Sequence, residues 1–205
     1  GFKYFAREDA KTVGIIGPGV MSKTAFDAAM AVRPGIETVR IKGSSLTSPS
    51  AQKFAERVRR KYPSVRNIEI VATVEEAVRD ADIVEIATSS PTGDPSTYPY
   101  LDEAWLKPGA VVACPAAARF DDDFILNRAR IVTDNIMLYE AWADEMPYPA
   151  YETIPIPAVH CMDLIHDGKM TRDQIDDLGD ILAGNAPVHR RQDEIVIYSV
   201  GGKIG

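Results

Sequence analysis

The chain has 205 residues, of which 45% are hydrophobic and 26% charged, as in an ordinary globular domain. Its 30 acidic residues outnumber its 23 basic residues, and the net charge of −7 argues against nucleic acid or an anionic membrane as a partner. No apolar run is long enough to span a bilayer. The two cysteines, Cys114 and Cys161, form no disulfide or metal-binding pattern, so we expect no metal site and a reducing, cytoplasmic location.

Up to residue 134, short apolar runs alternate with stretches of helical periodicity. We expect strands at residues 12–17, 37–42, 67–73, 82–88, 110–115 and 130–134. Helices are expected at residues 21–32, 50–62, 74–79 and 121–127, with a helical turn at 101–106. Repeated strand–helix units of this length predict an α/β fold whose doubly wound sheet is mostly parallel, as in a Rossmann domain.

The pattern loosens after residue 134. The proline-containing residues 148–157 predict an extended loop. Thr171 is placed to cap a helix over residues 172–183, which Gly184 would end. Residues 194–200 (with the sequence EIVIYSV) predict one more strand. We therefore expect residues 1–205 to form a single domain, in which the tail 148–205 completes or covers the sheet.

A glycine motif follows the first predicted strand and opens the first long helix. Gly17, Gly19 and Ser22 occupy the three positions of a GxGxxG pattern, with serine in the third. The first glycine permits a tight turn, and the second lets the backbone approach a pyrophosphate at the helix N-terminus. This context favours dinucleotide binding over the alternative, a tight turn that binds nothing.

The end of the second strand bears on which dinucleotide is bound. Domains that prefer NAD usually carry Asp or Glu there, to accept hydrogen bonds from the ribose 2′-hydroxyl. Here Lys42, Ser44 and Ser45 occupy the segment and suit a 2′-phosphate, so we predict NADP, with NAD as the alternative. Thr88 and Cys114 end the fourth and fifth strands, where a doubly wound fold holds its ligand.

Several stretches together resemble the ornithine cyclodeaminase/mu-crystallin family. They are residues 12–21 (TVGIIGPGVM), 74–89 (VEEAVRDADIVEIATS), 106–113 (LKPGAVVA), 177–184 (DLGDILAG) and 194–201 (EIVIYSVG). The resemblance implies a Rossmann domain joined to a dimerisation and substrate domain built mainly from preceding sequence. We therefore expect this chain to be a fragment of a two-domain protein, homodimeric at full length, that acts on a small molecule. The cofactor contacts implied by the resemblance fall on Gly17, Gly19, Val20, Met21, Thr88, Ala113, Cys114 and Ser199.

One departure from the family pattern bears on the reaction. The cyclodeaminases carry an aspartate after the fifth strand that acts on the substrate amine, and Ala118 stands in its place here. A methyl group can neither accept a proton nor pair with an ammonium group. The leading hypothesis is therefore an NADP-dependent oxidoreductase of an amino acid or its imine, with the catalytic residues unassigned. A cyclodeaminase-type lyase using bound NAD and a non-catalytic, mu-crystallin-like binding protein are the alternatives.

Overall fold

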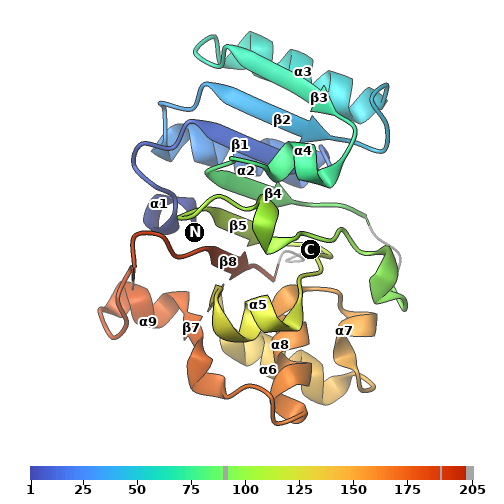
Figure 1. The fold of residues 1–205 in the computed structure, drawn as a ribbon, viewed down its shortest axis with the longest axis vertical. Coiled ribbons are helices and arrows are strands. Elements are labelled where there is room, and N and C mark those ends of the chain that lie inside the picture. The colour runs from blue at the N-terminus through green and yellow to red at the C-terminus, as the bar shows by residue number, and fades with distance from the viewer. Residues whose placement is uncertain (90–91, 190, 202–205) are drawn as a thin grey trace.

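The computed structural model describes residues 1–89, 92–189 and 191–201, which form one parallel sheet with helices on both faces (Figure 1). The strand order is β3-β2-β1-β4-β5-β8-β6-β7, and all neighbouring strands among these residues run parallel. The strands are β1 (Thr12–Ile16), β2 (Thr38–Lys42), β3 (Asn67–Val71), β4 (Ile83–Ile86), β5 (Val111–Cys114), β6 (Arg130–Thr133), β7 (Ile175–Asp177) and β8 (Val196–Ser199). The predicted doubly wound α/β fold is confirmed.

Two hydrophobic cores lie on the opposite faces of this sheet. One face is covered by α1 (Phe2–Phe5), α2 (Val20–Val32), α3 (Pro49–Lys61) and α9 (Leu178–Ala183). The other is covered by α4 (Val74–Val78), α5 (Asp122–Asn127), α6 (Ile136–Glu145), α7 (Ala150–Thr153) and α8 (Pro157–His166). The central strands are buried on both sides, which explains why they read as continuous apolar runs. No helix of the described residues is long and apolar enough to cross a membrane.

The prediction of an extended loop at residues 148–157 is wrong, because this segment forms α7 and leads directly into α8. The carboxylate of Asp163 accepts hydrogen bonds from the backbone N–H groups of Ala150 and Tyr151, each at 2.9 Å, and so fixes the first turn of α7. Pro157 occupies the first turn of α8, where a missing N–H group leaves no helical bond unmade. Pro157, which favoured a loop in the sequence, therefore marks the start of α8.

The single helix predicted over residues 172–183 is also wrong. A short 3₁₀ turn (Arg172–Gln174) is followed by β7 and then by α9, which ends at Gly184 as expected. β7 exists because its backbone pairs with β6, with Ile175 opposite Ile131. Asp177 then caps α9 by accepting a 2.7 Å hydrogen bond from the N–H group of Gly179.

The tail completes the sheet, because β8 lies between β5 and β6 and β7 forms one edge. A buried ion cluster holds this part together. The guanidinium of Arg130 donates to Asp176 at 2.7 Å and to Glu194 at 3.2 Å, and also to the backbone carbonyls of Pro187 and Val188. All three charged side chains are less than 10% exposed, so the cluster ties the β6, β7 and β8 segments in a single arrangement.

Candidate functional site

The candidate site lies at the carboxyl ends of the strands, where the strand order reverses direction at β1. In the sheet, β2 and β3 lie on one side of β1, whereas the next strands along the chain, β4 and β5, lie on its other side. At such a switch point the loops after neighbouring strands diverge to opposite faces and leave a crevice. The loop 17–19, which joins β1 to α2, stands at this crevice.

Gly17 is required by the close approach of two backbone segments. Its φ of +82° lies in the left-handed region, and a Cβ at this position would lie 2.7 Å from the carbonyl oxygen of Ala87. Its N–H group donates to the carbonyl oxygen of Lys42 at 3.0 Å, which ties the loop to the end of β2. The first glycine of the motif therefore has the role in a tight turn that the sequence predicted.

Gly19 has a different role, because it faces open space. A Cβ built on Gly19 would find no atom within 4 Å. Gly19 is the N-cap of α2, so no side chain caps the helix, and the first turn carries no acidic residue. The amide groups and the positive dipole end of a 13-residue helix are thus left accessible to an anion.

Ser22 takes the third glycine position and is fully buried. Its hydroxyl donates to the carbonyl oxygen of Gly17 at 2.6 Å, across the first turn of α2. The small side chain thus lets the helix pack closely on the sheet and also fixes the glycine turn.

The glycine loop borders a hollow of about 510 Å³, which we name the glycine hollow. No carboxylate lines it among the described residues, and its polar side chains are those of Lys42, Ser44, Ser50, Thr88, Ser89 and Thr97. The ammonium of Lys42 donates to the carbonyl oxygen of Gly43 at 2.5 Å and lies at the wall of the hollow. Ser45, the third predicted 2′-phosphate ligand, is not part of the lining, and its hydroxyl lies 3.3 Å from that of Thr47.

A second hollow of about 550 Å³, which we name the alanine hollow, continues the first along the strand ends. The two share Ala87, Thr88 and Ser89, the residues that follow β4. Met21 from α2 and the loop 115–117 after β5 supply further walls, and Trp142 of α6 and Ile156 close the far side. Sequence reasoning missed the last two as site residues because it had not predicted α6 or α8.

A model of the ornithine cyclodeaminase/mu-crystallin family matches residues 1–203 of the chain. The chain belongs to this family. Among curated proteins, a Delta(1)-pyrroline-2-carboxylate reductase of Paracoccus denitrificans is 26% identical over 98% of this chain and 57% of its own length.

Two solved structures show the same fold. One is the Thermococcus litoralis Delta(1)-pyrroline-2-carboxylate reductase in complex with NADH and L-proline, with a TM-score of 0.71 and 24% identity over 97% of this chain and 55% of that one. The other is the iminosuccinate reductase of Paracoccus denitrificans in complex with NAD⁺, with a TM-score of 0.68 and 24% identity over 98% of this chain and 54% of that one. The chain therefore spans little more than half the length of these relatives.

The family resemblance named several further contact residues, and the structure does not bring all of them to the two hollows. Cys114 and Ser199 are fully buried, and the hydroxyl of Ser199 accepts a 3.1 Å hydrogen bond from the N–H group of Ala158. Burial also raises the pKa of the Cys114 thiol well above its usual value. Neither residue lines the glycine or the alanine hollow.

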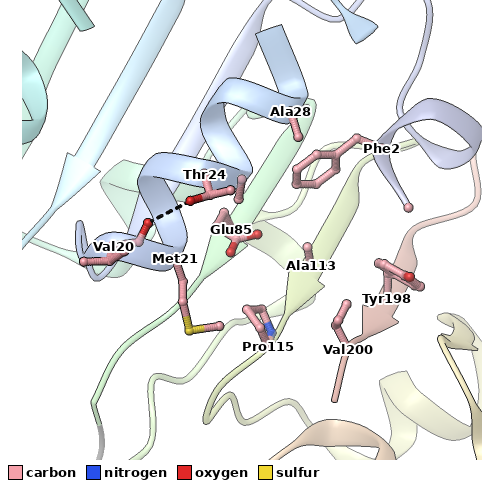
Figure 2. A pocket seen from close by; sticks show the side chains of 12 residues that line it. Phe2, Val20, Met21, Thr24, Ala28, Glu85, Ala113, Pro115, Tyr198 and Val200 are labelled. Carbon is pink, nitrogen blue, oxygen red and sulfur yellow. Dashed lines mark hydrogen bonds between the residues drawn. The ribbon is translucent and has the colours of Figure 1, made fainter. Parts of the chain in front are cut away.

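Val20 and Ala113 line a third cavity, of about 420 Å³, together with Met21. Glu85 of β4 also lines this cavity, which we name the Glu85 pocket. Figure 2 shows it between α2 and the ends of β4, β5 and β8. No role for Glu85 follows from the sequence, since a single glutamate within an apolar strand shows nothing about its partners.

The loop after β5 bears on the family chemistry. Ala116 and Ala117 line the alanine hollow, whereas Ala118 is buried and its carbonyl oxygen accepts a 2.5 Å hydrogen bond from the hydroxyl of Tyr151. The guanidinium of Arg119 turns away to lie over the ring of Tyr100, 4.6 Å from its centroid. In the described part of the chain, no group of His, Cys, Asp and Glu side chains is arranged to hold a metal ion.

Proposed function

We propose that this chain is the cofactor-binding part of an NAD(P)-dependent oxidoreductase that acts on an amino acid or its imine. The observation that carries the proposal is the continuous pair of hollows at the strand switch point, with an uncapped helix N-terminus at their side. The open face of Gly19 fits a diphosphate, because only a backbone without a side chain lets the phosphates reach the helix amides. The relatives crystallised with NADH and NAD⁺ support the same class of cofactor.

The two hollows divide the dinucleotide between them. The polar glycine hollow suits the adenosine ribose, and the alanine hollow, walled by Met21, Pro115 and Ile156, suits the nicotinamide ring. We propose a preference for NADP(H), since Lys42 and Ser44 line the first hollow and no carboxylate there would meet a ribose 2′-hydroxyl.

The chemistry that we propose is the reduction of a C=N bond or its reversal. A reduced nicotinamide held by Met21, Pro115 and Ile156 would supply a hydride for the imine carbon; the π electrons of the C=N bond would pass to the nitrogen, which would take up a proton. This chain's contribution is to hold the ring against apolar side chains such as Pro115 and Trp142 and to keep water from the reacting face. The three reductases among the relatives named above support this substrate class.

The lyase alternative has less support from the loop after β5. Ala118 presents a methyl group and uses its carbonyl oxygen to bind Tyr151, so it offers no carboxylate to a substrate amine. Substitution of Asp at position 118 in the full-length protein tests this alternative. Ammonia release that appears in Ala118→Asp would support a latent lyase site, and its absence would leave the reductase proposal as the better one.

Calorimetric titration of the protein with NADPH and NADH tests the proposal directly. We expect both to bind, with NADPH at least about fivefold tighter because its 2′-phosphate meets Lys42. Tighter binding of NADH would refute the NADP preference alone. If neither dinucleotide binds, the cofactor assignment itself is wrong. A screen of cyclic and acyclic imines with NADPH then separates a reductase from a non-catalytic binding protein.

A further inference from the structure

The Glu85 pocket lies on the face of the sheet that α2 covers, beside the alanine hollow. Its walls are almost entirely apolar, with Phe2, Met21, Ala28 and Val200 among them (Figure 2). Its volume of about 420 Å³ falls within the usual range of small-molecule sites, about 300–1,000 Å³. The cavity shares Met21 and Pro115 with the alanine hollow and includes no residue of the buried ion cluster of Arg130.

Of the residues that the structure describes, Glu85 is the one that brings a carboxylate to the lining of this pocket. It lies on β4 in register with Ile15 of β1 and Ala113 of β5, and its side chain is directed into the pocket beneath α2 (Figure 2). The residue is only 3% exposed. Within residues 1–89, 92–189 and 191–201, we find no hydrogen bond or ion pair that involves its carboxyl group. Burial raises its pKa from the usual 4.5 to about 8.

A buried carboxyl group without a partner costs stability, because it loses its hydration and gains nothing in exchange. The titratable groups on the surrounding elements do not relieve this cost. The hydroxyl of Tyr198 belongs to a residue that lines the same pocket, and the thiol of Cys114 is near enough for Glu85 to raise its pKa. Both groups are themselves shifted by burial toward their neutral forms. An aliphatic residue would fill this strand position more stably, so the glutamate points to a ligand.

We propose that the Glu85 pocket binds a compound that carries one protonated amino group on an apolar body. An ionised carboxylate only accepts hydrogen bonds, so it selects a donor and favours a cation. The apolar walls select a hydrocarbon or aromatic body of modest size. An anionic ligand would meet a like charge in a site of low polarity and is excluded.

The position of the pocket links this ligand to the reaction. Met21 and Pro115 line both the Glu85 pocket and the alanine hollow, where we place the nicotinamide. An amine held by Glu85 would therefore lie beside the cofactor. Its placement beside the cofactor rests on the proposed function, whereas binding of the amine itself does not.

Calorimetry on the intact protein without dinucleotide tests the inference, with three probes of similar size. These are n-hexylamine, the neutral 1-hexanol and the anionic hexanoate. We expect hexylamine to bind at least about tenfold more tightly than hexanol, and hexanoate not to bind, because only the amine pairs with the carboxylate. At pH 7 the carboxyl group of Glu85 ionises as the amine binds, so the binding enthalpy should depend on the ionisation enthalpy of the buffer, with up to one proton released.

Two variants separate the carboxylate from the shape of the pocket. Glu85→Gln keeps the shape, and we expect it to weaken hexylamine binding at least about tenfold and abolish proton release. Glu69→Gln is the matched control, because it makes the same change on β3, where Glu69 is exposed beside Arg40. It should leave hexylamine affinity and proton release unchanged. The comparison of the three probes on the unmodified protein needs no variant, so the test stands even if Glu85→Gln folds poorly.

Equal affinity for hexylamine and hexanol, or unchanged amine binding in Glu85→Gln, would overturn the inference. So would failure of hexylamine to bind, the result expected if another part of the intact protein already supplies a cation to Glu85. The NADPH titration stays independent of these outcomes. NADPH binding without amine binding leaves the proposed function in place and removes this inference, whereas amine binding without dinucleotide binding does the reverse.

Discussion

The hydroxyl of Ser22 donates a 2.6 Å hydrogen bond to the carbonyl oxygen of Gly17, so the first turn of α2 is fastened to the turn that precedes it. Ser22 lies in the first turn of α2, and its side chain is fully buried. A buried carbonyl group that loses its donor keeps its desolvation cost, and the turn also loses a constraint. The bond therefore connects the stability of the domain to the geometry of the proposed phosphate site.

We expect Ser22→Ala to lower the free energy of unfolding by about 1–2 kcal/mol, as measured by urea denaturation. NADPH affinity should fall severalfold, because the turn carrying Gly19 becomes less well fixed. Thr24→Val is the control, since the hydroxyl of Thr24 also donates to a helix carbonyl oxygen, that of Val20 at 3.3 Å, but on the exposed side. Equal losses of stability in the two variants would contradict a special role for Ser22.

Substitution by alanine should affect the two glycines of the loop differently, with the larger loss of stability at Gly17. Gly17→Ala forces a side chain into the left-handed region and against the carbonyl of Ala87, so we expect a loss of about 2 kcal/mol or more in stability. Gly19→Ala has allowed dihedral angles and open space, so stability should change by less than about 1 kcal/mol.

Among variants that fold, we expect the larger loss of NADPH affinity in Gly19→Ala, the reverse of the order for stability. The Cβ of Gly19→Ala would occupy the space that we assign to the diphosphate, and we expect at least about a tenfold loss of affinity with the melting temperature nearly unchanged. Thermal denaturation and calorimetry on the same samples separate the two effects. Full NADPH affinity in Gly19→Ala would show that the diphosphate does not approach the helix at this point.

Lys42 should govern the discrimination between the two dinucleotides. In Lys42→Ala, NADPH affinity is expected to fall about tenfold, because one cation beside the 2′-phosphate is lost, while NADH affinity stays within about twofold. Lys53→Ala removes an exposed lysine of α3 that does not line the glycine hollow, and should change neither affinity. A parallel loss of NADPH and NADH binding in Lys42→Ala would place Lys42 at the diphosphate instead of the ribose.

The Arg130 cluster should dominate the stability of the tail. Arg130→Leu leaves Asp176 and Glu194 buried without the guanidinium, and we expect it to cost about 3–5 kcal/mol. Arg128→Leu removes ion pairs with Glu103 and Asp123 at the exposed surface and should cost less than about 1 kcal/mol. Urea denaturation measures both. A similar small loss in the two variants would mean that the buried cluster is only as strong as a surface pair.

β1, β4, β5 and β6 could be predicted because each is buried almost throughout and shows as an apolar run, and β2 and β3 because apolar residues alternate along them. β7 could not, because Asp176 and Asp177 are poor strand residues and the strand exists only through pairing with β6 and the ion pair from Asp176 to Arg130. α8 was hidden because most of its sides are buried, so it lacks the polar face that signals a surface helix.

The candidate site shows the same limit. Gly17, Gly19, Lys42 and Thr88 border the glycine hollow, because a strand end followed by a helix start fixes their position, and their contact with a cofactor stays a prediction. Trp142 and Ile156 close the alanine hollow from a part of the chain more than 25 residues after β5, and no local pattern places them there. Ser199 follows the family pattern in sequence, but tertiary packing turns its hydroxyl to the N-terminus of α8.

The titration of Glu85 should be visible in the stability of the whole domain. Its pKa is about 8 in the folded protein and near 4.5 in the unfolded chain, so between these values the folded state holds one proton more. The free energy of unfolding therefore falls as the pH rises from about 5 to 8, by at most about 1.4 kcal/mol per pH unit from this group. Below pH 4.5 both states are protonated, and the contribution of Glu85 is fully present.

Urea denaturation of the protein and of Glu85→Gln at half-unit steps from pH 5 to 8.5 measures this contribution. Subtracting the two curves removes the titration of the histidines and of other groups common to both proteins. We expect the difference to grow in favour of Glu85→Gln as the pH rises, since the amide stays neutral while the carboxyl group ionises. A constant difference across this range would mean that Glu85 ionises in the folded protein at its ordinary pKa. The carboxyl group would then have water or a cation beside it, and the pocket would not be the dry site described here.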